Sequence, residues 1–272
     1  MHNKIDSLFS HLWQDYLTIT PSAKKVHDLL EGYEHRYSGK STKLVNDHIA
    51  LRTFNIEKIN LDKLAAHFLV LGYTEQGQYE FKEKKLRAKH FEHPGGTQPK
   101  VFISELIVEE MPYNVQQIIL NMTDNITDYA HQHDDFLYSG THWQVSTQEY
   151  DTLVAHSEYS AWMSAWGFRA NHFTVSLNHM GHFKSLTQMN NLLKDSGFVL
   201  NSSGGEIKGG TEVLLAQSSI MADKIKVEFA DGKKLVPSCF YEFAQRYQMP
   251  TGELYQGFVA ASADKIFEST NN

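Results

Sequence analysis

Cysteine is the scarcest residue of this 272-residue chain, because Cys239 is the only one. A single thiol excludes an intrachain disulfide, and it excludes zinc or iron–sulfur sites built from several thiolates. Any metal must therefore be bound through nitrogen and oxygen. Cys239 itself, in the string VPSCFYEF, could act as a nucleophile, but a lone thiol among aromatic residues is more typical of plain packing.

Long hydrophobic runs and an excess of positive charge are also absent. No run approaches the roughly 18 apolar residues that a membrane helix needs, and the opening MHNKID lacks the apolar core of a signal peptide. The formal net charge of −7 argues against a basic surface for nucleic acid. We therefore expect a cytoplasmic protein that binds neither membranes nor nucleic acid. Its oligomeric state does not follow from the sequence.

The remaining composition is that of a folded protein. Hydrophobic residues make up 41% of the chain and charged residues 21%, which favours a globular protein over a disordered one. No linker rich in proline, serine or glycine divides the sequence. We therefore expect residues 1–272 to share one core, in an α+β fold.

Two stretches repeat one order of predicted elements, namely a strand, a helix and three further strands. The first has a strand at 44–54, a helix at 61–71 and strands at 78–82, 86–92 and 101–108. The second has a strand at 172–177, a helix at 186–193 and strands at 204–208, 211–217 and 225–230. The aromatic stretch FYEFAQRY, at 240–247, is predicted to be helical.

The spacing of the two stretches supports a duplication. His48 precedes Gly72 by 24 residues, and His172 precedes Gly197 by 25. Two βαβββ modules, forming a curved mixed sheet around a metal cleft, are the simplest interpretation. We expect N-terminal helices at 1–43, the first module at 44–108, a helical insertion at 109–168, the second module at 169–231 and a closing segment at 232–272.

The candidate chemistry lies on the strands of these modules. Side chains alternate between the faces of a strand, so His48 and Arg52 share one face in VNDHIALR. His172 holds the corresponding position in NHFTVS. Glu105 and Glu228 follow the two histidines by 57 and 56 residues, near the ends of the modules. If the modules pair by pseudo-twofold symmetry, the two histidines and the two glutamates converge.

The number of ligands decides the class of reaction. Two imidazoles and one carboxylate leave coordination positions open, which suits non-haem Fe(II) and dioxygen. With both glutamates bound, the site would resemble a Lewis-acid centre for zinc or nickel. A histidine or glutamate in a strand is more often structural, so the pattern by itself leaves the metal site open. Arg52 could bind a carboxylate of an acidic substrate, or could instead form a structural salt bridge to Asp47 or Glu105.

Several strings resemble one known family. They are VNDHIALRTF, GFRANHFTVSLN, GGTEVLLAQSS, IKVEFADG, SCFYEFAQRY and LYQGFVAASADKIFESTN, and the resemblance spans residue 44 to the C-terminus. The repeat resembles the vicinal oxygen chelate architecture. The strings are more specifically similar to the DUF1338 family, which is associated with 2-oxoadipate dioxygenase/decarboxylase.

The resemblance implies a site and a reaction. His48, His172 and Glu228 would bind Fe(II), although other divalent metals could occupy the site. Arg52 would hold the distal carboxylate of a 2-oxo acid, with O2 as the second substrate, and 2-oxoadipate would give 2-hydroxyglutarate and CO2. Glu105 aligns with Glu228, but the resemblance does not make it a ligand, and we expect it to orient a histidine or a water molecule. The alternatives are a glyoxalase-like isomerase or lyase that uses Glu105 as a fourth ligand, and a non-catalytic module that binds a small molecule.

Overall fold

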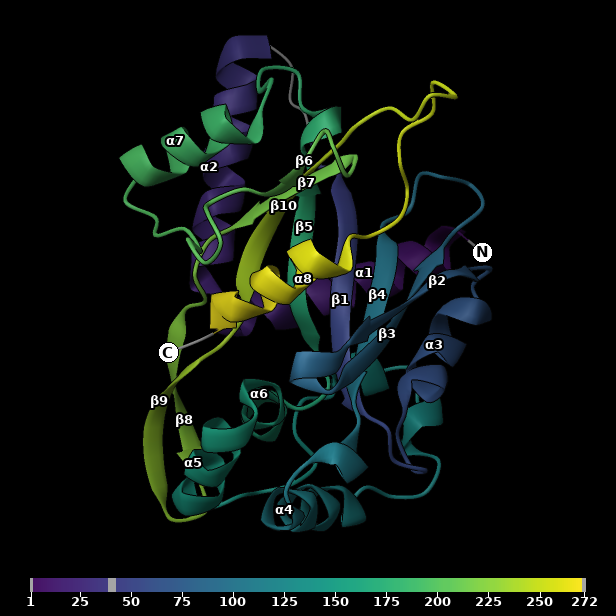
Figure 1. The fold of residues 1–272 in the computed structure, drawn as a ribbon, viewed down its shortest axis with the longest axis vertical. Coiled ribbons are helices and arrows are strands. Elements are labelled where there is room, and N and C mark those ends of the chain that lie inside the picture. The colour runs from purple at the N-terminus through teal and green to yellow at the C-terminus, as the bar shows by residue number, and fades with distance from the viewer. Residues whose placement is uncertain (1, 39–42, 271–272) are drawn as a thin grey trace.

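An eight-stranded mixed sheet organises the chain in the computed structural model, which describes residues 2–38 and 43–270 (Figure 1). The strand order is β2-β3-β4-β1-β5-β10-β7-β6, and β8 and β9 form a separate hairpin. The strands are β1 (Asn46–Phe54), β2 (Thr74–Phe81), β3 (Leu86–Glu92), β4 (Lys100–Leu106), β5 (Ala170–Ser176), β6 (Lys208–Gly210), β7 (Leu215–Ser219), β8 (Lys224–Phe229), β9 (Gly232–Pro237) and β10 (Phe240–Arg246). The helices are α1 (His2–Ile19), α2 (Pro21–Ser38), α3 (Leu61–Leu69), α4 (Tyr113–Asp124), α5 (Thr147–His156), α6 (Glu158–Trp166), α7 (Leu186–Asp195) and α8 (Ala260–Ile266).

The first unit runs β1-α3-β2-β3-β4, in the order expected from the sequence. Helix α3 begins where the Asn60 side chain accepts a hydrogen bond from the backbone N–H of Lys63, and it buries Leu61 and Phe68 against the sheet. The helix lets the chain return, so β4 pairs with β1 in parallel, while β2, β3 and β4 are antiparallel neighbours.

The second unit runs β5-α7-β6-β7-β10, and its last strand differs from the prediction. Residues 240–247 were expected to be helical, but Phe240–Arg246 forms β10 and pairs in parallel with β5. Phe240, Tyr241 and Phe243 are all 0% exposed, as expected of a strand that is buried on both faces. The predicted module 169–231 therefore ends before β10, the fourth strand of this unit. β10 lies within residues 232–272, which were expected to form a closing segment.

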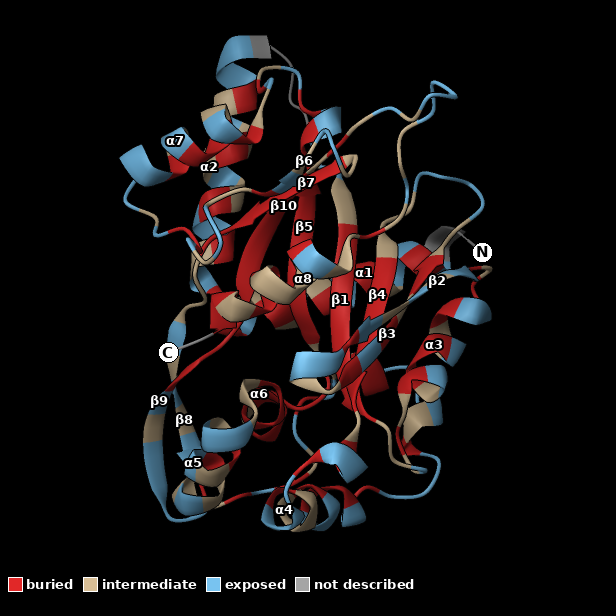
Figure 2. Cartoon of the chain, viewed as in Figure 1, coloured by how far each residue is buried: buried red, intermediate tan, exposed pale blue. Residues whose placement is uncertain are grey.

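The strand predicted at 225–230 exists, but it belongs to the hairpin. β8 pairs only with β9 among the described strands, and the two are joined by a turn at Ala230 and Asp231. The Asp231-Gly232 dipeptide in the sequence is a hairpin signal displaced by one residue from the observed turn. In Figure 2 most of this arm is exposed or of intermediate burial, whereas most of β1 and β10 and all of β5 are buried. The hairpin is an insertion that has no counterpart in the first unit.

The two units join through β1 and β5, which are antiparallel neighbours at the middle of the sheet. One sheet face packs against α1, where the ring of Tyr16 lies 5.0 Å from that of Phe173 of β5, at a tilt of 46°. The other face lies under α8, which crosses in front of β1 and β5 in Figure 1. This arrangement confirms the predicted α+β fold with duplicated βαβββ units. No helix among the described residues is both long and apolar enough to cross a bilayer.

Candidate metal centre

Two buried histidines face each other where the units meet. The antiparallel register places Ala50 opposite His172 and His48 opposite Thr174. The rings of His48 and His172 therefore lie on one face of the sheet, with their centroids 5.5 Å apart. The two residues are 2% and 5% exposed. The sequence predicted this pairing from strand alternation and the repeat.

Glu242 of β10 is the third member of the group. The parallel register places it opposite Thr174, next to the histidines, and it is 0% exposed. Its Oε2 lies 3.2 Å from His172 Nε2, and its Oε1 lies 3.6 Å from His48 Nε2. Gln217 donates a 2.6 Å hydrogen bond to Oε1. One donor atom from each of His48, His172 and Glu242 lies within 4.8 Å of the other two.

Neighbouring side chains orient both imidazoles. His48 Nδ1 lies 2.8 Å from Asp47 Oδ1, and His172 Nδ1 lies 3.1 Å from Asn171 Oδ1. Because these oxygens are acceptors, the ring proton of each histidine belongs on Nδ1, which leaves the Nε2 lone pair for the site. Arg246 in turn holds Asp47 through two hydrogen bonds of 2.7 and 2.8 Å.

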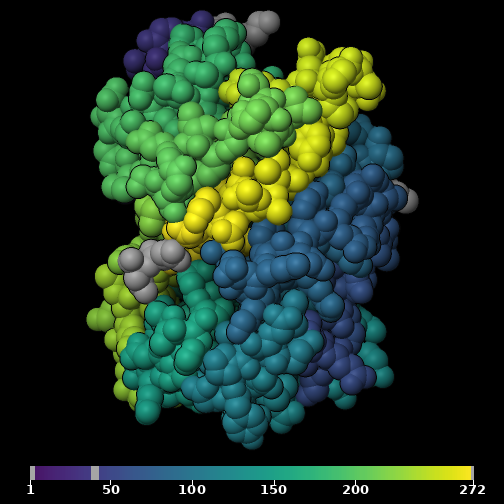
Figure 3. Space-filling model, viewed as in Figure 1, coloured from purple at the N-terminus to yellow at the C-terminus, as the bar shows by residue number. Residues whose placement is uncertain are grey.

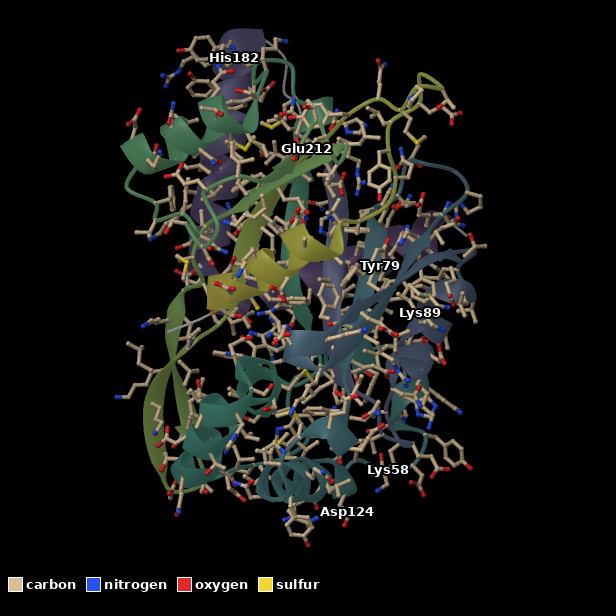
Figure 4. The ribbon with its side chains drawn as sticks, in the orientation of Figure 1. Lys58, Tyr79, Lys89, Asp124, His182 and Glu212 are labelled. Atoms are coloured by element: carbon tan, nitrogen blue, oxygen red, sulfur yellow. The ribbon has the colours of Figure 1, made fainter. Side chains whose placement is uncertain are left out.

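The C-terminal segment covers this group. Arg246 also donates hydrogen bonds to the carbonyls of Tyr255 and Gly257, and this segment places the Phe258 ring 4.8 Å from the His48 ring. Tyr79, labelled in Figure 4, accepts a hydrogen bond from the backbone N–H of Phe258. In Figure 3 the segment forms a diagonal band between the two units. The cavity beside the group is about 20 Å³, which is room for about one water molecule.

Burial shapes the electrostatics of the group. Burial raises the pKa of Glu242, although His48 opposes the shift, and burial, with His48 and Arg52 nearby, lowers the pKa of His172 well below its usual range. Burial would also raise the pKa of Asp47, but Arg246 and the hydrogen bond with His48 hold it well below the ordinary value. His172 is therefore neutral at pH 7 and available as a ligand.

We predict that His172 destabilises the metal-free protein in acid. A histidine whose pKa is lower in the folded state binds its proton more readily when unfolded, so unfolding is favoured as the pH falls below about 6.5. His172→Gln should therefore lose less unfolding free energy than the wild type between about pH 7 and pH 5. Urea denaturation at a series of pH values measures the difference, and parallel curves for the two proteins would contradict the prediction.

The donor set fits a divalent transition metal. Glu242 Oε2 has no hydrogen-bond partner among the described residues, and leaving a buried carboxylate oxygen unpaired costs free energy unless a ligand satisfies it. Two imidazoles and one carboxylate form the set typical of non-haem Fe(II) sites with open positions. The residues therefore fit a bound metal and leave coordination positions on it that no protein side chain fills.

Arg52 lies on the same strand face as His48, four residues further along β1. It is 1% exposed, and its guanidinium stacks among the rings of Tyr159, Trp162 and Phe267 at 4.8, 5.0 and 5.6 Å. Its ionic partner is Glu158, at 3.1 Å. The salt bridge to Asp47 or Glu105 that the sequence left open is not formed, because those carboxylates pair with Arg246 and Arg87.

The expected position of Glu228 is corrected by the structure. Glu228 lies on the β8–β9 arm, where its side chain is 73% exposed and lies 3.4 Å from Lys233. It does not reach the two histidines, and Glu242 takes that place. The cause is the inserted hairpin, which carries IKVEF away from the sheet and leaves FYEF to pair with β5.

The expected position of Glu105 is also corrected. Glu105 is buried on the opposite face of β4, where it accepts hydrogen bonds from the backbone N–H of Leu61 and from Arg87. It therefore holds the first turn of α3 and contacts neither histidine. The register shows what stands in its place. In the second unit Glu242 pairs with Thr174, two residues after His172. In the first unit the residue two after His48 is Ala50, and it pairs with Phe102. A phenylalanine therefore occupies the position related to Glu242.

Comparisons with known proteins show the family of this chain. The model of the 2-oxoadipate dioxygenase/decarboxylase family matches residues 8–254. The chain is 36% identical to a chloroplastic 2-oxoadipate dioxygenase/decarboxylase from Arabidopsis thaliana, over 94% of this chain and 74% of that protein. It is 32% identical to the hydroxyglutarate synthase from Oryza sativa solved in complex with 2-oxoadipate, with a TM-score of 0.91 over 98% of this chain and 91% of that one.

A third match concerns the fold alone. A glyoxalase-superfamily protein from Ralstonia eutropha JMP134 is 20% identical and has a TM-score of 0.73, over 94% of this chain and 86% of that one. This likeness confirms the predicted vicinal oxygen chelate-like architecture. The family assignment rests on the family model and the two closer relatives. By the extent and identity of those matches, the chain belongs to the 2-oxoadipate dioxygenase/decarboxylase family.

Proposed function

We propose that this protein is an Fe(II)-dependent dioxygenase and decarboxylase of a dicarboxylic 2-oxo acid. The implied reaction converts 2-oxoadipate and O2 into 2-hydroxyglutarate and CO2. The observation that carries the proposal is the buried group of His48, His172 and Glu242, with Arg52 on the same strand face. The names of the Arabidopsis and rice relatives support this substrate.

Each residue has a role in this proposal. His48, His172 and Glu242 would hold the metal, and Fe(II), when bound, supplies the redox chemistry by which dioxygen oxidises a 2-oxo acid with loss of CO2. The strand places Arg52 about 13 Å along β1 from His48, counted between Cα atoms. Its guanidinium would bind the distal carboxylate, so that the 2-oxo end of the acid lies toward the histidines.

The surroundings of the site favour this chemistry. Phe102, Phe258 and Phe267 line the cavity together with the three proposed ligands. These rings exclude bulk water and so strengthen the charge interactions inside the site. Asp47 and Asn171 hold the imidazoles in the tautomer that presents Nε2, which lowers the reorganisation needed when a metal binds.

The four-ligand alternative has less support. A glyoxalase-like centre needs a fourth protein donor, but Phe102 holds the position related to Glu242, and Glu105 lies on the other face of the sheet. A phenyl ring cannot bind a metal through a lone pair. Three protein ligands leave positions free for a chelating substrate and dioxygen, as the oxygenase reaction requires.

Oxygen uptake tests the proposal. The protein is loaded with Fe(II) without oxygen and then mixed with oxygenated buffer and 2-oxoadipate, or with its shorter and longer homologues. We expect one O2 consumed and one CO2 released per turnover, fastest with a dicarboxylic substrate. Absence of uptake with every 2-oxo acid would refute the proposed function. Tight zinc binding with no oxygen consumption would favour the isomerase instead.

The cellular location remains a prediction. The sequence led us to expect a cytoplasmic protein, whereas the two plant relatives are described as chloroplastic, or as chloroplastic and amyloplastic.

A further inference from the structure

Arg52 carries a buried charge that needs a counter-ion. Its side chain is 1% exposed and is surrounded by aromatic rings, so its positive charge is removed from water. An unpaired charge in such a place is strongly destabilising. In this structure the Glu158 carboxylate, 3.1 Å from Nη1, supplies the compensating negative charge.

Glu158 holds the guanidinium weakly. A guanidinium can bind both oxygens of a carboxylate through two parallel hydrogen bonds. Here a single oxygen, Glu158 Oε1, accepts hydrogen bonds from Arg52 Nη1 and from the Thr270 hydroxyl. Arg52 Nη2 makes one long contact of 3.4 Å to that same hydroxyl, and the buried Nε has no hydrogen-bond partner in the part of the chain that the structure describes. A carboxylate bound through both oxygens would therefore satisfy Arg52 better.

Glu158 also has room to leave. It is the first residue of α6, its side chain is 30% exposed, and it lines two cavities of about 210 and 180 Å³. Lys84, Lys85 and His156 line the smaller cavity, and the helix N-terminus favours a negative charge nearby. A displaced Glu158 carboxylate would remain in a solvated and partly positive environment.

The same carboxylate connects Arg52 to the C-terminal cover. Thr270 belongs to the 3₁₀ turn η6 (Phe267–Thr270), which directly follows α8. The cavity beside the histidines is far below the several hundred Å³ of a typical ligand site, so the cover must yield before a substrate can bind. Release of Glu158 removes one hydrogen bond that holds this cover.

We propose that Glu158 is the resident counter-ion of Arg52, and that the distal carboxylate of the substrate displaces it. The proposal rests on the proposed function, in which Arg52 binds that carboxylate. Glu158 then determines specificity: a 2-oxo acid without a distal carboxylate cannot replace it at Arg52, whereas a dicarboxylic one can.

Equilibrium binding under anaerobic conditions tests the exchange. The Fe(II)-loaded protein is titrated by calorimetry with 2-oxoadipate, and with 2-oxohexanoate, which lacks the distal carboxylate. In Glu158→Gln the competing charge is gone, so 2-oxoadipate should bind about fivefold more tightly, the effect of one partly exposed ion pair. The affinity for 2-oxohexanoate should not change. In Glu158→Asp the shorter side chain withdraws the carboxylate from Arg52, so the affinity for 2-oxoadipate should also rise, but by less.

A matched control separates local exchange from net charge. Glu83→Gln removes one negative charge from the same smaller cavity, without a contact to Arg52. It should leave both affinities unchanged, and equal tightening in this variant would overturn the proposal. The proposal would also be overturned if Glu158→Gln and Glu158→Asp bound 2-oxoadipate with unchanged or lower affinity. The same holds if their affinities for 2-oxoadipate and 2-oxohexanoate rose equally.

A further variant distinguishes the binding of substrate by Arg52 from the displacement of Glu158. Arg52→Gln should weaken 2-oxoadipate binding whether or not Glu158 is displaced. If it has no effect, the role of Arg52 in the proposed function is wrong. If Arg52→Gln weakens binding while Glu158→Gln does not strengthen it, only the exchange at Glu158 is refuted.

Discussion

Glu242→Gln is expected to abolish oxygen uptake and to weaken metal binding by more than about a hundredfold, a larger loss than removal of a group that merely supports a ligand. Glutamine keeps the size of the side chain and can still accept the hydrogen bond from Gln217, but it lacks the anionic oxygen that faces His172. Metal titration followed by oxygen uptake measures both losses.

Glu228→Gln is the matched control. It makes the same chemical change on the exposed hairpin, where the carboxylate contacts only Lys233 among charged groups of the described residues. Metal affinity and activity should stay at the wild-type level. The opposite result, with Glu228 essential and Glu242 dispensable, would restore the ligand set that the sequence suggested and refute the site described above.

Glu242→Gln also has a signature in the free energy of unfolding. Burial raises the pKa of Glu242, so in the metal-free protein its ionisation favours unfolding as the pH rises above the ordinary glutamate value. Metal-free Glu242→Gln should therefore be more stable than the wild type at neutral pH, and the difference should grow with pH until the raised pKa is passed. Urea denaturation of both proteins across this pH range measures the effect.

Arg52→Met is expected to lower kcat/KM for 2-oxoadipate by about 10²–10⁴-fold, because two charge-assisted hydrogen bonds of about 1.5–3 kcal/mol each are lost. With 2-oxohexanoate the same variant should show the same kcat/KM as the wild type, because this acid has no distal carboxylate for Arg52 to bind. Steady-state oxygen uptake with both acids measures the ratio. Equal losses of kcat/KM with the two acids would show that Arg52 does not bind the distal carboxylate.

Stability distinguishes this loss from misfolding. Methionine fits the ring-lined space that Arg52 fills, and the Glu158 carboxylate that loses its partner is 30% exposed and can be solvated. We therefore expect Arg52→Met to stay folded, with a melting temperature close to that of the wild type, and to bind metal normally. Arg52→Lys keeps the charge but loses the planar fork, so it should recover only part of the activity.

Much of the site could be predicted because it depends on local geometry. Strand alternation puts His48 and Arg52 on one face, and the repeat puts His172 in the matching place. The first unit, with its capped helix and its strands, follows from residues close together in the chain. Glu105 shows the limit of such reasoning, because its spacing matched the pattern while its position in β4 turns it toward α3.

The sequence by itself determined the duplicated α+β architecture and the placement of His48, His172 and Arg52 on one face of their strands. The reason is that the periodicity of strands and helices depends on residues that are consecutive in the chain. Only the tertiary structure decided the carboxylate. IKVEF and FYEF each offer one glutamate in a strand-forming string, and the choice between them depends on which strand pairs with β5. That pairing is set by hydrogen bonds and aromatic burial between segments about 70 residues apart, which no local pattern encodes. The same is true of Glu158, which meets Arg52 only because α6 packs beside β1 in the folded chain.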